Sequence, residues 1–384
     1  MTPNSYVTQC ASAPIAEVWS WIEDPSSPDL IDMCQAVPAY LPAQSLRDYL
    51  GEAVRQGKGA GYTSLYGIDP LRQALAKDIN QRYQCDVVAE DTVITAGCNQ
   101  AFCAVIDALC ETGDEVIAAL PCYFNHQMWL TIRGITPKYL SLNPETAIPD
   151  PAEIDQLVSA KTKAILLVSP NNPTGATYSP ECIEQFYQLA KQHNIALIVD
   201  ETYRDFIDPD SPPHHLFQHT DWRDTFIHLY SFSKTFALTG HRVGAIVSSQ
   251  SLQQQLAKIQ DCTVICASHP GQLAATYGLG HLHDWKVDKY KAMKRRGEAL
   301  MSAFEAPDLK YELLSVGAYF AYVKHPFDRN SHAVAKRLVQ EFGVLCLPGI
   351  YFGEGQEQYI RFAFANVDEA RFPELVARLI RSQV

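Results

Sequence analysis

Apolar and polar positions between Asp91 and Ser249 alternate in two ways along the chain. Short, almost continuous apolar runs such as Ala164–Val168 and Ala196–Val199 are typical of strands buried on both faces of a sheet. Between them lie segments with apolar residues at helical spacing, such as Pro180–His193. The other runs of these kinds are strand-like Thr92–Thr95, Glu115–Leu120, Phe226–Tyr230 and Ala245–Ser248, and helix-like Asn99–Cys110. This alternation predicts an α/β fold with an open, mostly parallel sheet covered by helices.

A charged segment, Trp285–Phe304, separates this region from the C-terminal part of the chain. Its helical spacing predicts a long connecting helix, and strand-like runs follow at Ala318–Val323 and Tyr359–Phe364. The first 45 residues or so have scattered prolines and no strong period. The length of 384 residues favours more than one domain. We therefore expect an arm with part of a small domain (1–48), a large domain (49–284) and a small α+β domain (285–384).

Composition and charge narrow the choice of partners. With 47% hydrophobic and 19% charged residues, the chain is typical of a globular protein with a large core. Its net charge of −12 argues against binding a nucleic-acid backbone. No apolar run approaches the ~20 residues that span a bilayer, so no membrane partner is expected. The eleven cysteines contain no C-x-x-C pair, so no metal site is expected. No signal peptide is apparent, which indicates a cytoplasmic protein.

Polar side chains follow the predicted strands, and in parallel sheets ligands bind beyond the carboxyl ends of the strands. Gly97-Cys98-Asn99 opens a helix, where free N–H groups suit a phosphate. Tyr123 follows the next strand and can stack on a flat ring, and Asn172 can donate to a ring oxygen. Asp200 can hold a protonated pyridine nitrogen, with Tyr203 three residues on. Taken singly, each is equally compatible with an ordinary turn or core residue.

The segment that follows the Phe226–Tyr230 strand contains the most informative side chains. Lys234 lies between Ser233 and Thr235, Ser231 comes shortly before it, and Arg242 lies eight residues beyond. An amine that forms a Schiff base beside a bound phosphate needs a nucleophilic nitrogen, hydroxyls and a fixed positive charge. Together with the other strand ends, this segment indicates a site for pyridoxal phosphate (PLP).

These motifs give the chain a resemblance to the class I/II aminotransferases, PLP enzymes of fold type I, over about residues 31–378. The pieces that support it are Asn171–Gly175, Asp200–Tyr203, Ser231–Arg242, Gly61-Tyr62-Thr63 and Tyr359–Ala363. The resemblance implies a PLP-dependent transferase fold of type I, with a large and a smaller domain. It also implies transfer of an amino group from an L-amino acid to a 2-oxo acid.

The resemblance further implies a role for each matching residue. Lys234 would form the Schiff base and then move the proton between the substrate Cα and the cofactor. Roles in cofactor binding would fall to Asp200 (pyridine nitrogen), Asn172 and Tyr203 (ring hydroxyl), Tyr123 (stacking), and Ser231, Ser233, Arg242 and the Gly97-Cys98-Asn99 turn (phosphate). Arg361 would bind the substrate α-carboxylate through a two-pronged pair. Tyr62 would reach the phosphate of a neighbouring subunit, which implies a homodimer with shared active sites.

The sequence departs from the family pattern where substrates are chosen. Ala36 stands where relatives have a glycine beside the substrate carboxylate, and alanine tolerates fewer backbone conformations. Tyr40 is predicted to be a substrate-pocket residue or a core residue of the small domain. Val264 occupies the position of the arginine that binds the second carboxylate in aspartate-specific relatives. An apolar side chain cannot pair with a carboxylate, so we expect an aminotransferase that is not aspartate-specific.

Two other functions are compatible with part of the sequence. A PLP-dependent C–S β-lyase would use the same cofactor motifs and begin with the same Cα carbanion. A regulator with an aminotransferase-like domain would need a helix-turn-helix ahead of the site, and the short, proline-bearing arm disfavours it. A non-catalytic relative is disfavoured because Lys234, Asp200 and Arg361 are all present.

Overall fold

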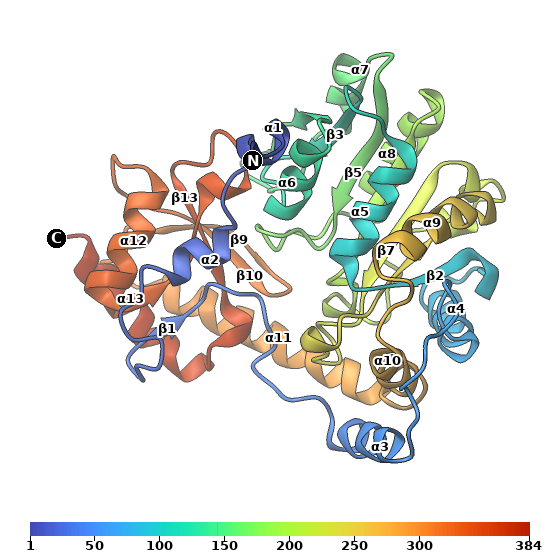
Figure 1. Cartoon of the computed structure of the whole chain (residues 1–384). Coiled ribbons are helices and arrows are strands. Elements are labelled where there is room, and N and C mark those ends of the chain that lie inside the picture. The colour runs from blue at the N-terminus through green and yellow to red at the C-terminus, as the bar shows by residue number, and fades with distance from the viewer. Residues whose placement is uncertain (144) are drawn as a thin grey trace.

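The computed structural model describes residues 1–143 and 145–384 and arranges them around a large sheet and a smaller one (Figure 1). Within the described residues the large sheet has seven strands. In spatial order these are β2 (Thr92–Thr95), β8 (Gly244–Val247), β7 (Phe226–Ser231), β6 (Ala196–Asp200), β5 (Thr162–Val168), β3 (Glu115–Ala119) and β4 (Thr136–Leu140). All neighbours from β7 to β4 are parallel, whereas β8 is antiparallel to both β7 and β2. The prediction of a mostly parallel sheet in an α/β fold is confirmed.

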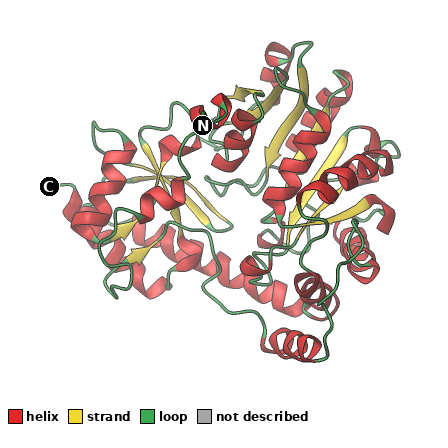
Figure 2. Ribbon diagram, in the orientation of Figure 1, coloured by secondary structure: helices red, strands yellow, loops and turns green. Residues whose placement is uncertain are grey.

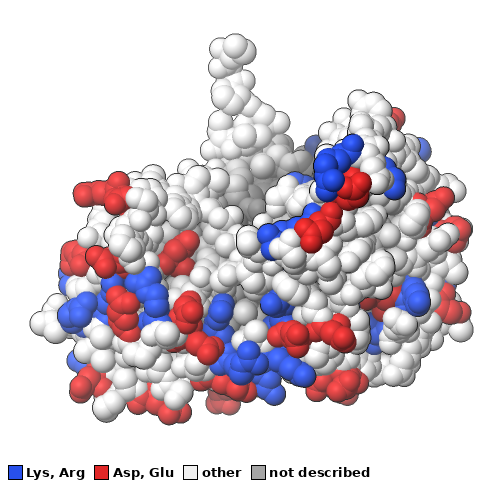
Figure 3. Space-filling view, turned by 90° about the horizontal axis from the view of Figure 1, so that it is seen from below, with Lys and Arg blue, Asp and Glu red and all other residues white. Residues whose placement is uncertain are grey.

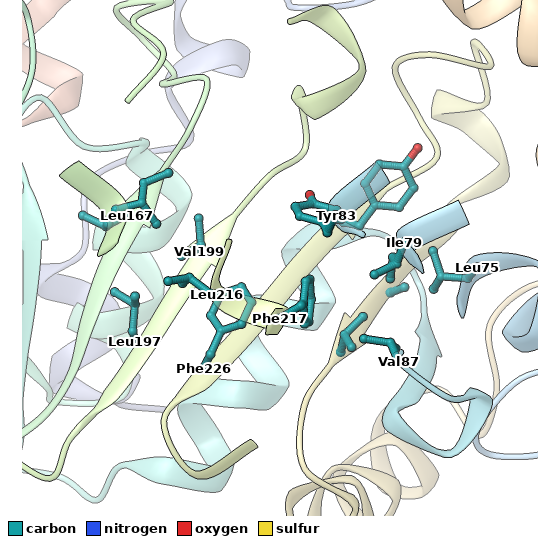
Figure 4. Close-up of a cluster of buried hydrophobic side chains, with 14 of the residues drawn as sticks. Leu75, Ile79, Tyr83, Val87, Leu167, Leu197, Val199, Leu216, Phe217 and Phe226 are labelled. Atoms are coloured by element: carbon teal, nitrogen blue, oxygen red, sulfur yellow. The ribbon is translucent and has the colours of Figure 1, made fainter. Parts of the chain in front are cut away.

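Helices cover both faces of the large sheet (Figure 2). The helices of this part are α3 (Gln44–Arg55), α4 (Asp69–Tyr83), α5 (Cys98–Leu109), α6 (Phe124–Ile132), α7 (Ile154–Leu157), α8 (Pro180–Gln192), α9 (Gln250–Thr263) and α10 (His269–His281). Alternate residues of β6 face opposite cores, as the pleat of a strand requires. Leu197 and Val199 pack with α4, α8 and α10, and Figure 4 shows part of this core. Ile198 packs on the other face with α5, α6 and α9.

The smaller sheet is antiparallel and lies with the C-terminal helices. Its strands, in order, are β12 (Leu347–Pro348), β13 (Tyr359–Ala363), β10 (Phe320–Lys324) and β9 (Glu312–Gly317). The helices here are α11 (His283–Phe304), α12 (Ser331–Phe342) and α13 (Phe372–Ser382). The long α11 is the helix expected at Trp285–Phe304, and in Figure 1 it runs from the large-sheet half to the small-sheet half.

The N-terminal arm contacts both halves of the molecule. Its first helix, α1 (Ser5–Gln9), lies beside α6, and the Cys10 thiol that follows is 3.7 Å from the Met128 carbonyl oxygen. After α2 (Pro14–Trp19), strand β1 (Ile31–Asp32) pairs with β11 (Val344–Leu345) of the small half. The expected division at residues 48 and 284 stays a prediction, and these positions fall within α3 and α11.

Strand β4 is not predicted by the pattern of apolar runs. It is an edge strand that is half-exposed over most of its length and contains Pro137 and Lys138. A proline is tolerated at a sheet edge because it has no N–H to donate to a neighbour. The lack of a continuous apolar run therefore concealed this strand.

Charged side chains are mixed on the surface. On the face shown in Figure 3, lysine and arginine lie among aspartate and glutamate, and the described residues form no continuous basic stripe there. None of the described helices is long and apolar enough to cross a bilayer.

Candidate active site

The strand ends predicted to carry the chemistry lie at one edge of the large sheet. Strands β2, β3, β5, β6 and β7 run in one direction, so their carboxyl ends meet, and the antiparallel β8 begins at the same edge. A cavity of about 520 Å³ opens there. Of the residues predicted from the sequence, those lining it are Ala36, Cys98, Asn99, Tyr123, Asn172, Asp200, Tyr203, Ser231, Ser233, Lys234, Arg242 and Arg361. The fold therefore brings together side chains that are up to 325 residues apart, from Ala36 to Arg361.

Lys234 projects its amine into this cavity from the turn after β7. Its Nζ donates a hydrogen bond to the Ala36 carbonyl oxygen at 2.6 Å. Burial, together with the positive charges of Arg361 and Arg242, lowers the pKa of Lys234 to about 8. A lysine with this pKa is neutral in a large fraction of molecules slightly above neutral pH, as a nucleophile or base must be.

Asp200 ends β6 with its carboxylate buried beside the cavity. One oxygen accepts from the Thr202 amide at 3.0 Å and lies 3.4 Å from the Cys98 thiol; the other is 3.3 Å from His126 Nε2. Burial alone would raise the pKa of Asp200, but the hydrogen bond and charge of His126, with help from Thr202, hold it below its usual value. The carboxylate therefore stays ionised and can hold a cationic N–H.

His126 was absent from the sequence prediction, although a signal existed. It lies three residues after Tyr123 at the start of α6, and residues at this spacing share a helix face. The two rings meet edge to face with centroids 5.1 Å apart. Tyr123 itself lines the cavity and accepts a hydrogen bond from Asn125 at 3.0 Å.

Glu201, the neighbour of Asp200, faces the opposite core. Its carboxylate lies 2.8 Å from His228 Nε2 and 3.4 Å from His214 Nε2, and it accepts from the Tyr83 hydroxyl. Burial would raise the pKa of Glu201, but the imidazoles of His214 and His228 beside it hold that pKa far below its usual range. Two consecutive carboxylates are thus committed to different faces of the sheet.

The turn before α5 forms a cradle for an anion. Gly97 has φ +89 and is the N-cap of α5, so the first free N–H groups of that helix lie beside the cavity-lining Cys98 and Asn99. A Cβ on Gly97 would collide with the Arg242 guanidinium, which approaches this backbone closely. Gly97 therefore lies behind the cavity wall. The Arg242 guanidinium and the N-terminus of α5 lie together on this side of the cavity. Ser231 and Ser233 line the same cavity, buried.

Arg361 is a buried cation whose hydrogen-bond donors are not all paired within the described residues. Its Nη1 donates to Asn172 Oδ1 at 2.9 Å, and its Nη2 donates to the Cys34 carbonyl. The guanidinium lies 5.0 Å from the Phe320 ring centroid. Among the described residues its Nε has no hydrogen-bond acceptor. Burial lowers the pKa of Arg361, but a guanidinium remains protonated, so a buried anion such as a carboxylate would be strongly favoured here.

Three predicted residues lie elsewhere. Gly97 is one layer behind the cavity, as described above. The Tyr62 side chain is 81% exposed, and Tyr62 and Tyr40 are not among the described residues that line the cavity. Tyr40 instead donates its hydroxyl to the Lys234 carbonyl oxygen at 3.1 Å. The arm also supplies Ala13, Pro14, Ile15 and Val37 to the lining, which its aperiodic sequence did not predict.

Comparison with known proteins identifies the family. The family described as aminotransferase class I and II matches residues 28–379. The chain belongs to this family and is an aminotransferase, as the resemblance indicated.

Relatives differ in the substrate that their names state. The chain is 29% identical over 374 residues to an aromatic aminotransferase of Arabidopsis thaliana, covering 95% of this chain and 92% of that protein. It is 29% identical over 359 residues to an aspartate aminotransferase of Thermotoga maritima, covering 91% and 90%. An Escherichia coli protein with a methionine aminotransferase function superposes with a TM-score of 0.89 and 25% identity, over 99% of this chain and 100% of that one.

Proposed function

We propose that this aminotransferase uses PLP bound through Lys234 and transfers the amino group of an L-amino acid to a 2-oxo acid. One observation supports this most strongly: the Lys234 amine, the Asp200 carboxylate and the Arg361 guanidinium line a single cavity of about 520 Å³. The donors also fit the cofactor: the Gly97 turn and Arg242 suit a phosphate, and an ionised Asp200 suits a pyridinium N–H. When bound, PLP supplies the electron sink that stabilises a carbanion at the substrate Cα.

The protein's own groups would divide the remaining work. Arg242, Ser231, Ser233 and the N-terminus of α5 bind the phosphate, and Asp200 keeps the ring nitrogen protonated. Tyr123 packs against the ring face, and Tyr203 donates to the ring oxygen, since burial keeps its pKa well above the usual value and the hydroxyl protonated. Lys234 would act as the base that takes the proton from the substrate Cα and moves it within the site.

Arg361 would orient the substrate. A carboxylate placed against its guanidinium satisfies the unpaired Nε, and Asn172, already bonded to Nη1, limits where the carboxylate can lie. A substrate held at its α-carboxylate presents its Cα–H in a fixed direction, and this converts an encounter into an oriented reaction.

The amino donor is expected to have an apolar or aromatic side chain. The arm lines the cavity with Ala13, Pro14, Ile15 and Val37, and Val264 replaces the arginine of aspartate-specific relatives. Apolar walls stabilise apolar side chains and leave a second carboxylate unpaired.

The active form is expected to be a homodimer. Tyr62, Val264 and Ile265 expose 81%, 37% and 39% of their surface. They belong to segments tied to one another, since the Thr63 amide is 3.4 Å from the Cys266 thiol. A fixed exposed apolar surface favours association, and Tyr62 would then reach the phosphate of the second subunit. Cytoplasmic location stays a prediction.

A half-reaction screen tests the proposal. Protein loaded with PLP is mixed with single amino acids, and conversion of the bound cofactor to its amino form is followed in the visible spectrum, with Lys234→Ala as control. We expect conversion with aromatic or thioether amino acids and little with aspartate. Release of ammonia and pyruvate from cystathionine would instead indicate C–S β-elimination. A protein that retains no chromophore after PLP is added would contradict the whole proposal.

A further inference from the structure

The main chain of Lys234 is bonded to side chains from outside its own segment. The Tyr40 hydroxyl lies 3.1 Å and the Tyr319 hydroxyl 3.3 Å from the Lys234 carbonyl oxygen, and the two hydroxyls are 3.2 Å apart. Each hydroxyl has one proton to donate, so two hydrogen bonds can link the two hydroxyl oxygens and the Lys234 carbonyl oxygen. Burial raises the pKa of both tyrosines, which keeps those protons in place over the working pH range.

The next residue is held in the same way. The Trp285 indole N–H donates to the Thr235 carbonyl oxygen at 2.9 Å, and its ring meets Tyr40 edge to face at 5.7 Å. The three aromatic side chains come from the arm, from α11 and from the turn between β9 and β10. Segments that are distant in the sequence therefore converge on residues 234–235.

Tyr319 is itself fixed relative to the large sheet. It is fully buried, with ring centroids 4.6 Å from Phe206 and 5.4 Å from Tyr203. The turn before it packs backbone to backbone on the loop that carries Asn172: a Cβ on Gly175 would lie 2.5 Å from the Gly317 amide nitrogen. Such close contact leaves the turn little freedom to move away from the sheet edge.

We propose that Tyr40 and Tyr319 are positioning residues for the aminotransferase reaction. Their hydroxyls hold the main chain of Lys234 in place, so that its side-chain amine starts from a fixed position. This inference rests on the proposed role of Lys234 as the reacting amine. The same arm segment contacts both ends of that lysine, since Ala36 accepts from Nζ and Tyr40 donates to the carbonyl oxygen. A shift of the Lys234 main chain by a fraction of an ångström would displace the amine from the proton that it must accept.

The test compares Tyr40→Phe, Tyr319→Phe and the double variant with Tyr311→Phe. The control removes a buried hydroxyl of the small half, which lies 2.8 Å from Ser382 Oγ. Phenylalanine keeps the ring packing, and thermal unfolding checks that each variant is folded. We expect the double variant to lose at least about ten-fold in kcat with an unchanged KM for the amino donor. In cofactor-free protein, amide hydrogen exchange of the peptide spanning residues 234–242 should become faster.

The outcomes separate this inference from the proposed function. A double variant that retains its chromophore, with kcat and exchange equal to those of the control, would overturn the positioning role while leaving the PLP assignment intact. A rise in KM with kcat unchanged would also overturn it and would make Tyr40 a substrate-pocket residue. If wild-type protein holds no chromophore, the proposed function fails first, before the variants are compared.

Discussion

The two sides of the cavity differ in how they are built. On the large-sheet side, Asp200 and Lys234 follow buried strands and Cys98 opens a helix, so their positions are set by the hydrogen-bond ladder of the sheet. On the other side, the cavity is closed by the arm and by Arg361 of β13, and Arg361 is joined to the loop after β5 by a side-chain hydrogen bond from Nη1 to Asn172. We infer that cofactor chemistry depends on the rigid side, whereas substrate choice depends on the side built from separate segments.

The largest effect is expected at the centre of the rigid side. Lys234→Ala should lower kcat by at least about 10⁴-fold, because both the nucleophile and the general base of the proposed reaction would be lost. The cavity and its phosphate ligands should remain, so bound cofactor measured by absorbance should be partly retained. A variant with near-native turnover would remove Lys234 from the reaction and with it the basis for the contrast between the two sides.

The opposite side is tested by Arg361→Lys. A lysine cannot reproduce the two-pronged geometry, and hydrogen bonds to charged groups contribute about 1.5–3 kcal/mol each, so kcat/KM should fall about 100-fold. Cofactor affinity should not change. Arg55→Lys, which alters an exposed arginine paired with Glu52 on α3, is the control and should be silent. Loss of cofactor with unchanged substrate KM would show that Arg361 belongs to the rigid side.

A smaller effect is expected from Gly97→Ala. Alanine at φ +89 and ψ 166 is strained by about 1–3 kcal/mol, and its Cβ would also displace the Arg242 guanidinium from the proposed phosphate cradle. The control is Gly113→Ala, which has φ +96 and open space around the added Cβ. Both variants should unfold at lower temperature, but only Gly97→Ala should weaken PLP binding in a fluorescence titration. Equal PLP affinities in the two variants would argue against the cradle.

The smallest effect is expected from His126→Asn. His126 holds the pKa of Asp200 below its usual value, so its removal should raise that pKa. Asp200 would then take up a proton at a higher pH as the solution is acidified, and the acid limb of the kcat/KM profile should move upward in pH. At neutral pH the loss in kcat should be less than about ten-fold, the equivalent of one pKa unit. An unmoved acid limb would mean that His126 is a packing residue only.

The sequence predicts the large-sheet side of the cavity better than the side formed by the arm. The Ala164–Val168 and Ala196–Val199 runs are buried on both faces, so their pattern is unambiguous and the side chains beyond them could be placed at one edge. Tyr40 was harder, because its position depends on how the arm crosses α11 and meets Tyr319, contacts that no local pattern encodes. The cavity-lining residues Ala13, Pro14 and Ile15 were missed for the same reason. The proposed role of Arg361 comes from the motif resemblance, because periodicity alone does not indicate it.

The neighbouring carboxylates of Asp200 and Glu201 make strand β6 sensitive to its alignment. A slip by one residue, about 3.3 Å, would turn Glu201 toward the cavity and bury Asp200 between His214, His228 and Tyr83. The cavity would still contain an acid, but an acid one methylene too long, and the histidines would face an acid one methylene too short. The contacts of His214, His228 and Tyr83 therefore favour the alignment of β6 in which Glu201, and not Asp200, faces them.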